Sequence, residues 1–359
     1  MWPNRRLLEL FRIEHPIVLA PMAGAMDAAL AIAVAKGGGL ASLPAALLKA
    51  DQLREQVATF RAAAGDAPLN LNFFAHTPPV PNNAREHAWR EKLKPYYVEL
   101  GIDPNAPVPA SNRAPFDEAF CAVVEEVRPA AVSFHFGLPG TALVTRVKAA
   151  GCLVLGAATT VAEAVWLEQR GCDVIIAQGY EAGGHRGLFL TDDLAAQVGT
   201  FSLVPQVADA VRVPVIAAGG IADARGIVAA LALGAAAVQI GTAYLACPES
   251  KILPLHRAAL KTARDDGTAV TNVMTGRPAR GLVNRLMREL GPISDAAPAF
   301  PLAGGALAPL HAKAQAQGSG EFSSMWAGQS AALAREMPAT DLTRSLAAEA
   351  QALMRTLAA

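Results

Sequence analysis

Charged residues are scarce in this sequence, and the two signs balance. They make up 17% of the 359 residues, with 31 Lys and Arg against 31 Asp and Glu. Without a basic surplus, nothing favours nucleic acid or an acidic membrane surface as a partner. No uninterrupted apolar run approaches the ~20 residues of a membrane span. Glu9, Arg12 and Glu14 interrupt the short apolar run near the N-terminus, which argues against a signal peptide. We therefore expect a cytoplasmic protein.

Cysteine is also rare, and its spacing matches no metal or redox motif. The four residues are far apart and include no CxxC pair; they are Cys121, Cys152, Cys172 and Cys247. Such cysteines are typical of small apolar core residues in a reducing compartment. The seven histidines form neither an HxxxH pair nor a cluster with cysteine, so no metal site is expected. A P-loop and a GxSxG elbow are absent as well.

Apolar residues, in contrast, are abundant at 52% and occur as short runs separated by helical patterns. Eight runs read as buried strands: 17–20, 39–43, 69–73, 131–136, 153–156, 173–177, 214–218 and 236–240. Helical patterns follow most of them, at 27–35, 51–64, 116–127, 140–150, 160–170, 200–211 and 223–233. Several begin with Asp or Thr, which satisfy the free N–H groups at a helix start. This alternation predicts an α/β fold, a (β/α)₈ TIM barrel, with a doubly wound open sheet as the second choice.

Two segments interrupt the alternation. The first, 75–115, is rich in Pro and Asn, carries an amphipathic helix around 84–100 and leaves from the end of the third strand. The second, 246–324, is too long for an ordinary loop. We expect helices in it around 251–262 and 282–289, and a loop over the Pro-, Ala- and Gly-rich stretch 296–309. Together the two segments predict a smaller lid domain over the barrel mouth. The barrel domain would then comprise 1–245 and 325–359, closing with a helix over 328–357 broken near Pro338.

The stretch 173–187 organises the predicted site. A buried strand leads into Gln178, and Gly183 and Gly184 then precede His185. Glycine allows the backbone to approach a ligand closely, and catalytic side chains of a barrel lie at the C-terminal ends of its strands. His185 is therefore the first candidate for a catalytic residue, and an unperturbed histidine titrates near ~6.5. His135, at the end of the fourth strand, faces the same end and is the second candidate.

Polar and glycine-bearing loops follow the other strands. Gly219 and Gly220 follow the seventh strand, and Gly241 and Thr242 follow the eighth. In barrels these two loops commonly bind a phosphate through backbone N–H groups, although glycine turns are also common in ordinary connections. Asn72 and Gln178 can offer a donor and an acceptor to the edge of a heterocycle. Such convergence from several strand ends predicts a ligand site.

At this point the sequence resembles the flavin-dependent nitronate monooxygenases, formerly called 2-nitropropane dioxygenases, and class I most closely. The motifs that carry the resemblance occur in order along nearly the whole chain. They are HPIVLAPMAG (15–24), LNFFAH (71–76), VSFHFGLP (132–139), QGYEAGGHRG (178–187), AAGGIADARG (217–226), VQIGTAYL (238–245), GRPARGLVN (276–284) and WAGQSAALARE (326–336).

The resemblance implies FMN as the cofactor, in a barrel with an inserted domain. It implies His185 as the active-site histidine and His135 as a second histidine of the pocket. The positions it implies for FMN are Ala20, Pro21, Met22, Asn72, Gln178, Gly183, Gly219, Gly220, Gln239, Ile240, Gly241 and Thr242. One segment departs from the family: 298–305 contains none of the tyrosine or lysine that relatives place in the substrate pocket. We therefore expect a pocket that accepts less polar substrates.

The reaction implied is oxidation of alkyl nitronates by O₂ to a carbonyl compound and nitrite, with propionate 3-nitronate as the suggested substrate. An NAD(P)H-dependent quinone or enoyl-thioester reductase of related barrel fold is the alternative that keeps the flavin. A flavin-free barrel, such as a phosphosugar isomerase or lyase, is the alternative from another class. A Schiff-base aldolase is disfavoured because no lysine ends a predicted strand. Whether two copies pair as a homodimer stays open.

Overall fold

The computed structural model describes residues 2–109 and 113–359, so residues 110–112 of the predicted excursion lie outside the described part. Eight parallel strands form a barrel, as predicted, in the order β1-β9-β8-β6-β5-β4-β3-β2. A bridge between Val18 and Leu40 joins its ends, and Leu40 N–H donates to Ile17 O at 2.9 Å. The strands are β1 (Ile17–Leu19), β2 (Ala41–Pro44), β3 (Leu69–Phe74), β4 (Ala131–His135), β5 (Leu153–Ala158), β6 (Val174–Gln178), β8 (Val215–Ala218) and β9 (Ala237–Ile240).

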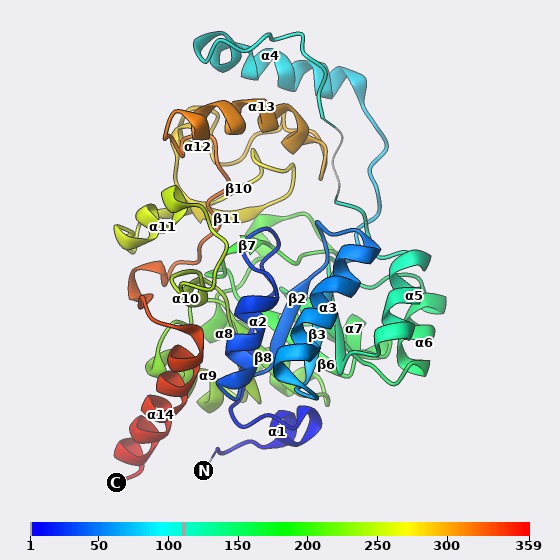
Figure 1. The fold of residues 1–359 in the computed structure, drawn as a ribbon, viewed down its shortest axis with the longest axis vertical. Helices are drawn as coiled ribbons and strands as arrows, with labels where there is room; N and C mark the ends of the chain where they lie inside the picture. The colour runs from blue at the N-terminus through cyan, green and yellow to red at the C-terminus, as the bar shows by residue number, and fades with distance from the viewer. Residues whose placement is uncertain (1, 110–112) are drawn as a thin grey trace.

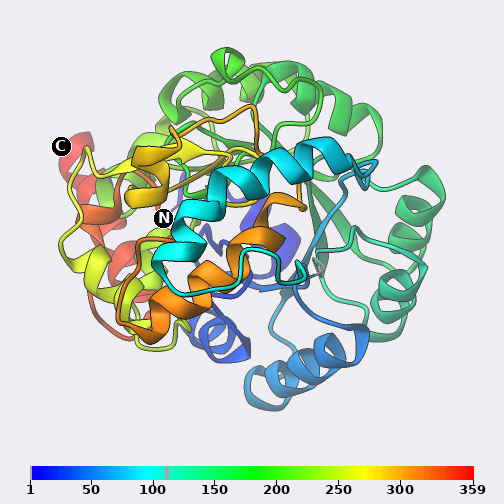
Figure 2. The ribbon, with the colours of Figure 1, turned by 90° about the horizontal axis from the view of Figure 1, so that it is seen from above.

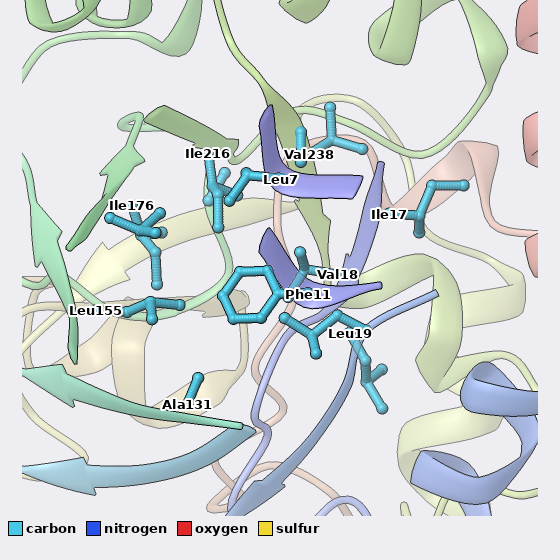
Figure 3. Packing of buried hydrophobic residues seen from close by; sticks show 14 of the residues in the cluster. Leu7, Phe11, Ile17, Val18, Leu19, Ala131, Leu155, Ile176, Ile216 and Val238 are labelled. Atoms are coloured by element: carbon cyan, nitrogen blue, oxygen red, sulfur yellow. The ribbon is translucent and has the colours of Figure 1, made fainter. Parts of the chain in front are cut away.

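The barrel core consists of the aliphatic side chains of these strands. Figure 3 shows Leu155, Ile176 and Ile216 pointing toward one another from neighbouring strands. Leu7 and Phe11 of helix α1 (Arg6–Phe11) lie among them and are buried. Because β-branched and aliphatic residues on both faces of a strand need cover on both sides, these runs fold as parallel strands wrapped by helices.

The surrounding helices match the predicted ones within a few residues. Asp27, Asp117, Thr160 and Asp223 cap four of them, each accepting a hydrogen bond from a backbone N–H of the first turn. The helices between the strands are α2 (Ala28–Lys36), α3 (Ala50–Ala64), α5 (Glu118–Val127), α6 (Thr141–Ala149), α7 (Val161–Gln169), α8 (Thr200–Ala210) and α9 (Ala224–Ala232), with a 3₁₀ turn η1 (Leu194–Ala196) before α8.

Two helices from the predicted insertions run side by side across one end of the barrel (Figures 1 and 2). They are α4 (Asn83–Glu99) and α13 (Ala303–Ala316). Trp89 Nε1 donates to Ala303 O at 3.2 Å and Tyr97 Oη to Ala306 O at 2.5 Å. The prediction of a loop through residue 309 was therefore wrong. Packing against α4, with Ala306, Leu307 and Leu310 buried, stabilises a helix that its Gly and Pro residues disfavour locally.

Two further predictions near the C-terminus need correction. The helix expected over 282–289 is shorter, because β11 (Ala279–Leu282) precedes α12 (Arg285–Glu289) and Asn284 caps that helix through Met287 N–H. The closing helix α14 (Ala339–Ala358) begins only after Pro338. Before Pro338 the chain forms just a 3₁₀ turn, η2 (Ala331–Leu333). Helix α11 (Pro254–Lys261) lies within the predicted 251–262.

A small antiparallel sheet, which the sequence did not predict, connects the barrel to the insertion. Its order is β10-β11-β7, where β7 (Gly184–His185) follows barrel strand β6 and β10 (Thr268–Thr271) belongs to the insertion. His185 pairs with Ala279 and Gly184 with Arg280. His185 thus lies on a strand shared by both parts of the molecule. The two chain ends lie at the opposite end of the barrel from α4 and α13 (Figure 1). Within residues 2–109 and 113–359, no helix has both the length and the apolar character that a membrane crossing needs.

Candidate functional site

A cavity of about 600 Å³ lies between the C-terminal ends of the barrel strands and the insertion. Most of the residues singled out from the sequence line it. Ile240 does not: its side chain is fully buried in the barrel, and its carbonyl accepts the N–H of Ala20 at 2.9 Å. Those that line it are Ala20, Pro21, Met22, Asn72, His135, Gln178, Gly183, His185, Gly219, Gly220, Gln239, Gly241 and Thr242.

The loops after β8 and β9 present free backbone donors to this cavity. Gly219 and Gly220 have φ values of 108° and 71°, which side chains rarely tolerate. Among the described residues, no group accepts a hydrogen bond from the N–H of Gly220, Ile221 or Gly241. Converging N–H groups of this kind suit an anionic oxygen cluster such as a phosphate.

The same loops are anchored by residues 326–330, the start of the WAGQSAALARE motif, called the WAGQ segment below. Ser330 Oγ donates to Gly220 O at 2.9 Å, and Gly328 N–H donates to Thr242 Oγ1 at 2.9 Å. Thr242 is the first residue of the short helix α10 (Thr242–Leu245). Since its hydroxyl accepts from Gly328, it retains a hydrogen for a ligand.

Between these loops and His185 the cavity has room and hydrogen-bonding groups for a flat ligand. Gln239 Oε1 is buried and has no partner among the described residues. A Cβ on Gly184 would meet no atom within 4 Å. Asn72 Nδ2 donates to Ser133 Oγ at 3.0 Å, which turns its amide in a fixed direction. Buried polar groups normally have partners, so the free oxygen of Gln239 fits the donor edge of a bound heterocycle.

His185 is surrounded by aromatic rings. The ring centroids of Phe300, Trp326, Phe136 and Phe74 lie at 5.3, 5.4, 5.9 and 6.1 Å from that of His185. Its Nε2 lies 2.9 Å from the hydroxyl of Thr275. The imidazole is therefore fixed in position and shielded from water on several sides.

This environment keeps His185 neutral. Burial, then the positive charge of Arg113 and the neighbouring His135 and Arg277, lower the pKa of His185 well below its ordinary value. The expectation of a group titrating near 6.5 therefore needs correction. Burial likewise lowers the pKa of His135 and of His76 to about 4.

The lining of the cavity is cationic where it is charged. Arg113 and Lys251 line it, and none of its described lining residues is Asp or Glu. Lys251 also pairs with Asp27 at 3.2 Å. A cavity of this charge favours an anionic ligand.

Two side chains named from the sequence hold the backbone of His185. His135 Nε2 and Gln178 Nε2 each lie 3.0 Å from His185 O, and Gln178 Oε1 accepts from Gly187 N–H at 2.7 Å. A carbonyl only accepts, so His135 carries its proton on Nε2. Both ends of the Gln178 amide thus make a hydrogen bond within the protein, and the amide nitrogen keeps a second hydrogen for a ligand.

Gly183 has a packing role that the sequence did not reveal. A Cβ on it would lie 2.5 Å from Gly328 N, and a Cβ on Gly328 would lie 2.8 Å from Glu181 O. The two glycines therefore allow the segment before His185 and the WAGQ segment to pack backbone against backbone.

Several site residues escaped the sequence analysis. Arg113 and Thr275 come from segments without a recognisable pattern, and only the fold brings them to His185. Trp326 could have been found from the sequence, since it is the first residue of the WAGQ motif. Phe300 belongs to the segment 298–305, which the sequence distinguished only by its lack of tyrosine and lysine. All four cysteines are free and buried. In the described part of the chain, no three His, Cys, Asp or Glu residues are grouped to hold a metal ion.

Comparison with known proteins matches nearly the whole chain to one family. The family model described as "Nitronate monooxygenase" matches residues 4–349. The chain is 44% identical to a nitronate monooxygenase of Pseudomonas aeruginosa over 348 residues, which are 96% of this chain and 98% of the relative. It is similar to the structure of nitroalkane oxidase from Streptomyces ansochromogenes, with 38% identity, a TM-score of 0.89 and coverage of 98% and 99%. It is also similar to FabK from Thermotoga maritima, with 29% identity, a TM-score of 0.75 and coverage of 100% and 99%.

Proposed function

Because the chain belongs to the nitronate monooxygenase family, and is thus an oxidoreductase that acts on nitronates, we propose that it binds FMN and uses O₂ to oxidise alkyl nitronates. The products would be a carbonyl compound and nitrite. One observation carries the proposal: a single cavity joins free backbone donors at the β8 and β9 loops to a neutral histidine walled by aromatic rings.

The donor set of this cavity suits FMN. The N–H groups of Gly220, Ile221 and Gly241, with the hydroxyl of Thr242, would hold the phosphate. Gln239 and Asn72 would contact the edge of the flavin, with Met22 beside the ring. When bound, the flavin accepts electrons from the substrate and passes them to O₂, while the protein supplies position and electrostatics.

The substrate is an anion, for which propionate 3-nitronate is our candidate. Arg113 lines the cavity and would attract it through its positive charge. His185 is neutral and therefore contributes no positive charge to the binding of a preformed nitronate. With a neutral nitroalkane, His185 would instead remove the carbon-bound proton as a general base. His135 becomes a positioning residue, because its Nε2–H holds His185 O.

The predicted division of the chain fits this function. We propose that residues 246–324 and the 75–115 excursion form the lid, and that 1–245 with 325–359 form the FMN-binding barrel. The substrate-binding end of the site would then depend on contacts between the two parts. We also propose a homodimer and a cytoplasmic location, of which the buried, free cysteines support only the location.

Anaerobic mixing tests the proposal. A purified protein with the yellow colour of a flavoprotein should bleach on adding propionate 3-nitronate alone and recover its colour with O₂. Rapid bleaching by NADH or NADPH, with no response to nitronate, would instead support the quinone or enoyl-thioester reductase. A colourless protein that binds no FMN would support a flavin-free barrel.

A further inference from the structure

His185 begins a short hydrogen-bond chain that leads away from the cavity. Its Nε2 lies 2.9 Å from Thr275 Oγ1, and the same hydroxyl lies 3.4 Å from the carbonyl oxygen of Arg277. Thr275 is 2% exposed and does not line the cavity. One imidazole nitrogen is thus engaged on the protein side, and the other, Nδ1, has no hydrogen-bond partner among the described residues.

The direction of these hydrogen bonds follows from the number of hydrogens. A threonine hydroxyl has one hydrogen to donate and can also accept. Within the described part of the chain, the Arg277 carbonyl has no other donor. If Thr275 donates to that carbonyl, its oxygen accepts from His185 Nε2–H and every group of the chain is satisfied. In the reverse direction the carbonyl loses its donor, which is costly for a half-buried group.

We propose that Thr275 is a positioning residue that fixes His185 in the Nε2–H tautomer, so that Nδ1 is the nitrogen that accepts the substrate proton. The inference rests on the proposed function. In the step concerned, the C–H bond of a neutral nitroalkane breaks and its electron pair enters the nitro group, forming the nitronate. The proton bonds to His185 Nδ1 and later leaves to solvent.

The charges around His185 fit this assignment. Arg113 from the 75–115 excursion and Arg277 from the β10–β11 connection face it, with His135 from β4 and His76 after β3. These groups and burial keep the imidazole neutral, and a neutral imidazole exists as one of two tautomers. Thr275 selects between those tautomers, since it is the hydrogen-bonding partner of the ring.

Nitrogen-15 NMR of histidine-labelled, FMN-bound protein near neutral pH reads the tautomer directly. The His185 signals, assigned by their loss in His185→Gln, should show a protonated Nε2 and an unprotonated Nδ1. The opposite pattern in the wild-type protein would overturn the proposal, whatever the variants do.

Kinetics supply the second test. Thr275→Val removes the hydroxyl at nearly constant side-chain volume. The value of kcat/KM for a neutral nitroalkane should then fall by ~10-fold, which corresponds to the loss of one hydrogen bond. Turnover of preformed nitronate should stay within ~2-fold, because no proton is removed there. Thr275→Ser should restore both the rate and the tautomer signals. Thr271→Val, the same change on β10 of the small sheet, is the matched control and should leave the turnover of both substrates unchanged.

The outcomes separate this inference from the proposed function. If His185→Gln abolishes nitroalkane turnover but Thr275→Val has the wild-type rate and tautomer, the role of Thr275 is refuted while the base remains. If His185→Gln turns over nitroalkane at the wild-type rate, the proposed base itself is wrong. Equal losses on nitroalkane and nitronate in Thr275→Val would indicate a merely structural role and contradict the proposal.

Discussion

Gly183→Ala should damage the site through backbone packing, although no ligand need touch the new methyl group. The added Cβ would lie 2.5 Å from Gly328 N and 2.6 Å from Ala327 C. Real Cβ contacts essentially never fall below 3.0 Å. Because both opposing atoms are backbone, neither can rotate away, and one of the two segments has to move.

The size of the effect follows from that geometry. Overpacking of this kind typically costs about 1–3 kcal/mol of the free energy of unfolding. The movement also reaches the cavity, since Gly328 N–H is the donor to Thr242 Oγ1. We therefore expect weaker FMN binding and lower activity in Gly183→Ala together with the lost stability.

A control variant separates local strain from displacement of the site. Gly65 lies at the end of α3 with φ 59°, and a Cβ added to it would meet no atom within 4 Å. Gly65→Ala should lose about 1–3 kcal/mol from the strain of its positive φ alone, with FMN content and activity unchanged. Urea unfolding, flavin absorbance and turnover should be measured on both variants. Wild-type stability and FMN affinity in Gly183→Ala would refute the packing argument.

Three further outcomes are expected. Gly220→Asp should lose FMN yet stay folded, because its carboxylate would compete with the phosphate and lie near Glu181, whose Cβ is 3.5 Å from the new Cβ. The control Gly220→Ala, with the same backbone strain but no charge, should retain more FMN. Full FMN content in Gly220→Asp would contradict the phosphate assignment. Stability should fall between pH 7 and pH 5, because His135, with a pKa of about 4 when folded and about 6.5 when unfolded, takes up its proton mainly in the unfolded state. It should contribute about 3 kcal/mol of stability above pH 6.5 that is lost as the pH falls toward 4, and urea midpoints independent of pH over this range would refute the argument. Nitronates with longer, uncharged alkyl chains should have kcat/KM within ~10-fold of propionate 3-nitronate, since the apolar rings of Phe74 and Trp326 line the cavity and lie 6.1 and 5.4 Å from the ring of His185. A much stronger preference for the carboxylated substrate in a substrate panel would contradict this.

The barrel could be predicted from the sequence because its signals are local. Each strand is a short apolar run, and residues such as Asp27 and Asp223 mark helix starts within a few positions. The small sheet could not be predicted this way. Strand β7 has two residues, and its pairing with β11 joins positions about ninety residues apart. Helix α13 was missed for a related reason, since α4 stabilises a stretch whose local composition favours a loop.

The candidate site likewise contains residues that the sequence could predict and residues that it could not. Gln239 lies at the C-terminal end of β9, and Gly220 and Thr242 come two residues after β8 and β9, so their meeting at one end of the barrel follows from the fold class. Thr275 and Arg113 come from long insertions whose path no sequence pattern determines. The neutral state of His185 also depends on its burial by rings from four separate segments, which spacing alone does not disclose.

The small sheet limits how this enzyme can be recombined with its relatives. His185 leaves the barrel on β7 yet pairs with Ala279 of the insertion, so the proposed catalytic residue is encoded in one part and held by the other. A chimera that exchanges 246–324 alone would join a foreign β11 to the native β7 and misplace the imidazole. Exchanging 183–190 and 326–330 together with the insertion preserves the pairing of β7 with β11 and the packing of Gly183 against Gly328. In this chain, therefore, the surroundings of His185 depend on three segments that are discontinuous in sequence, 183–190, 246–324 and 326–330.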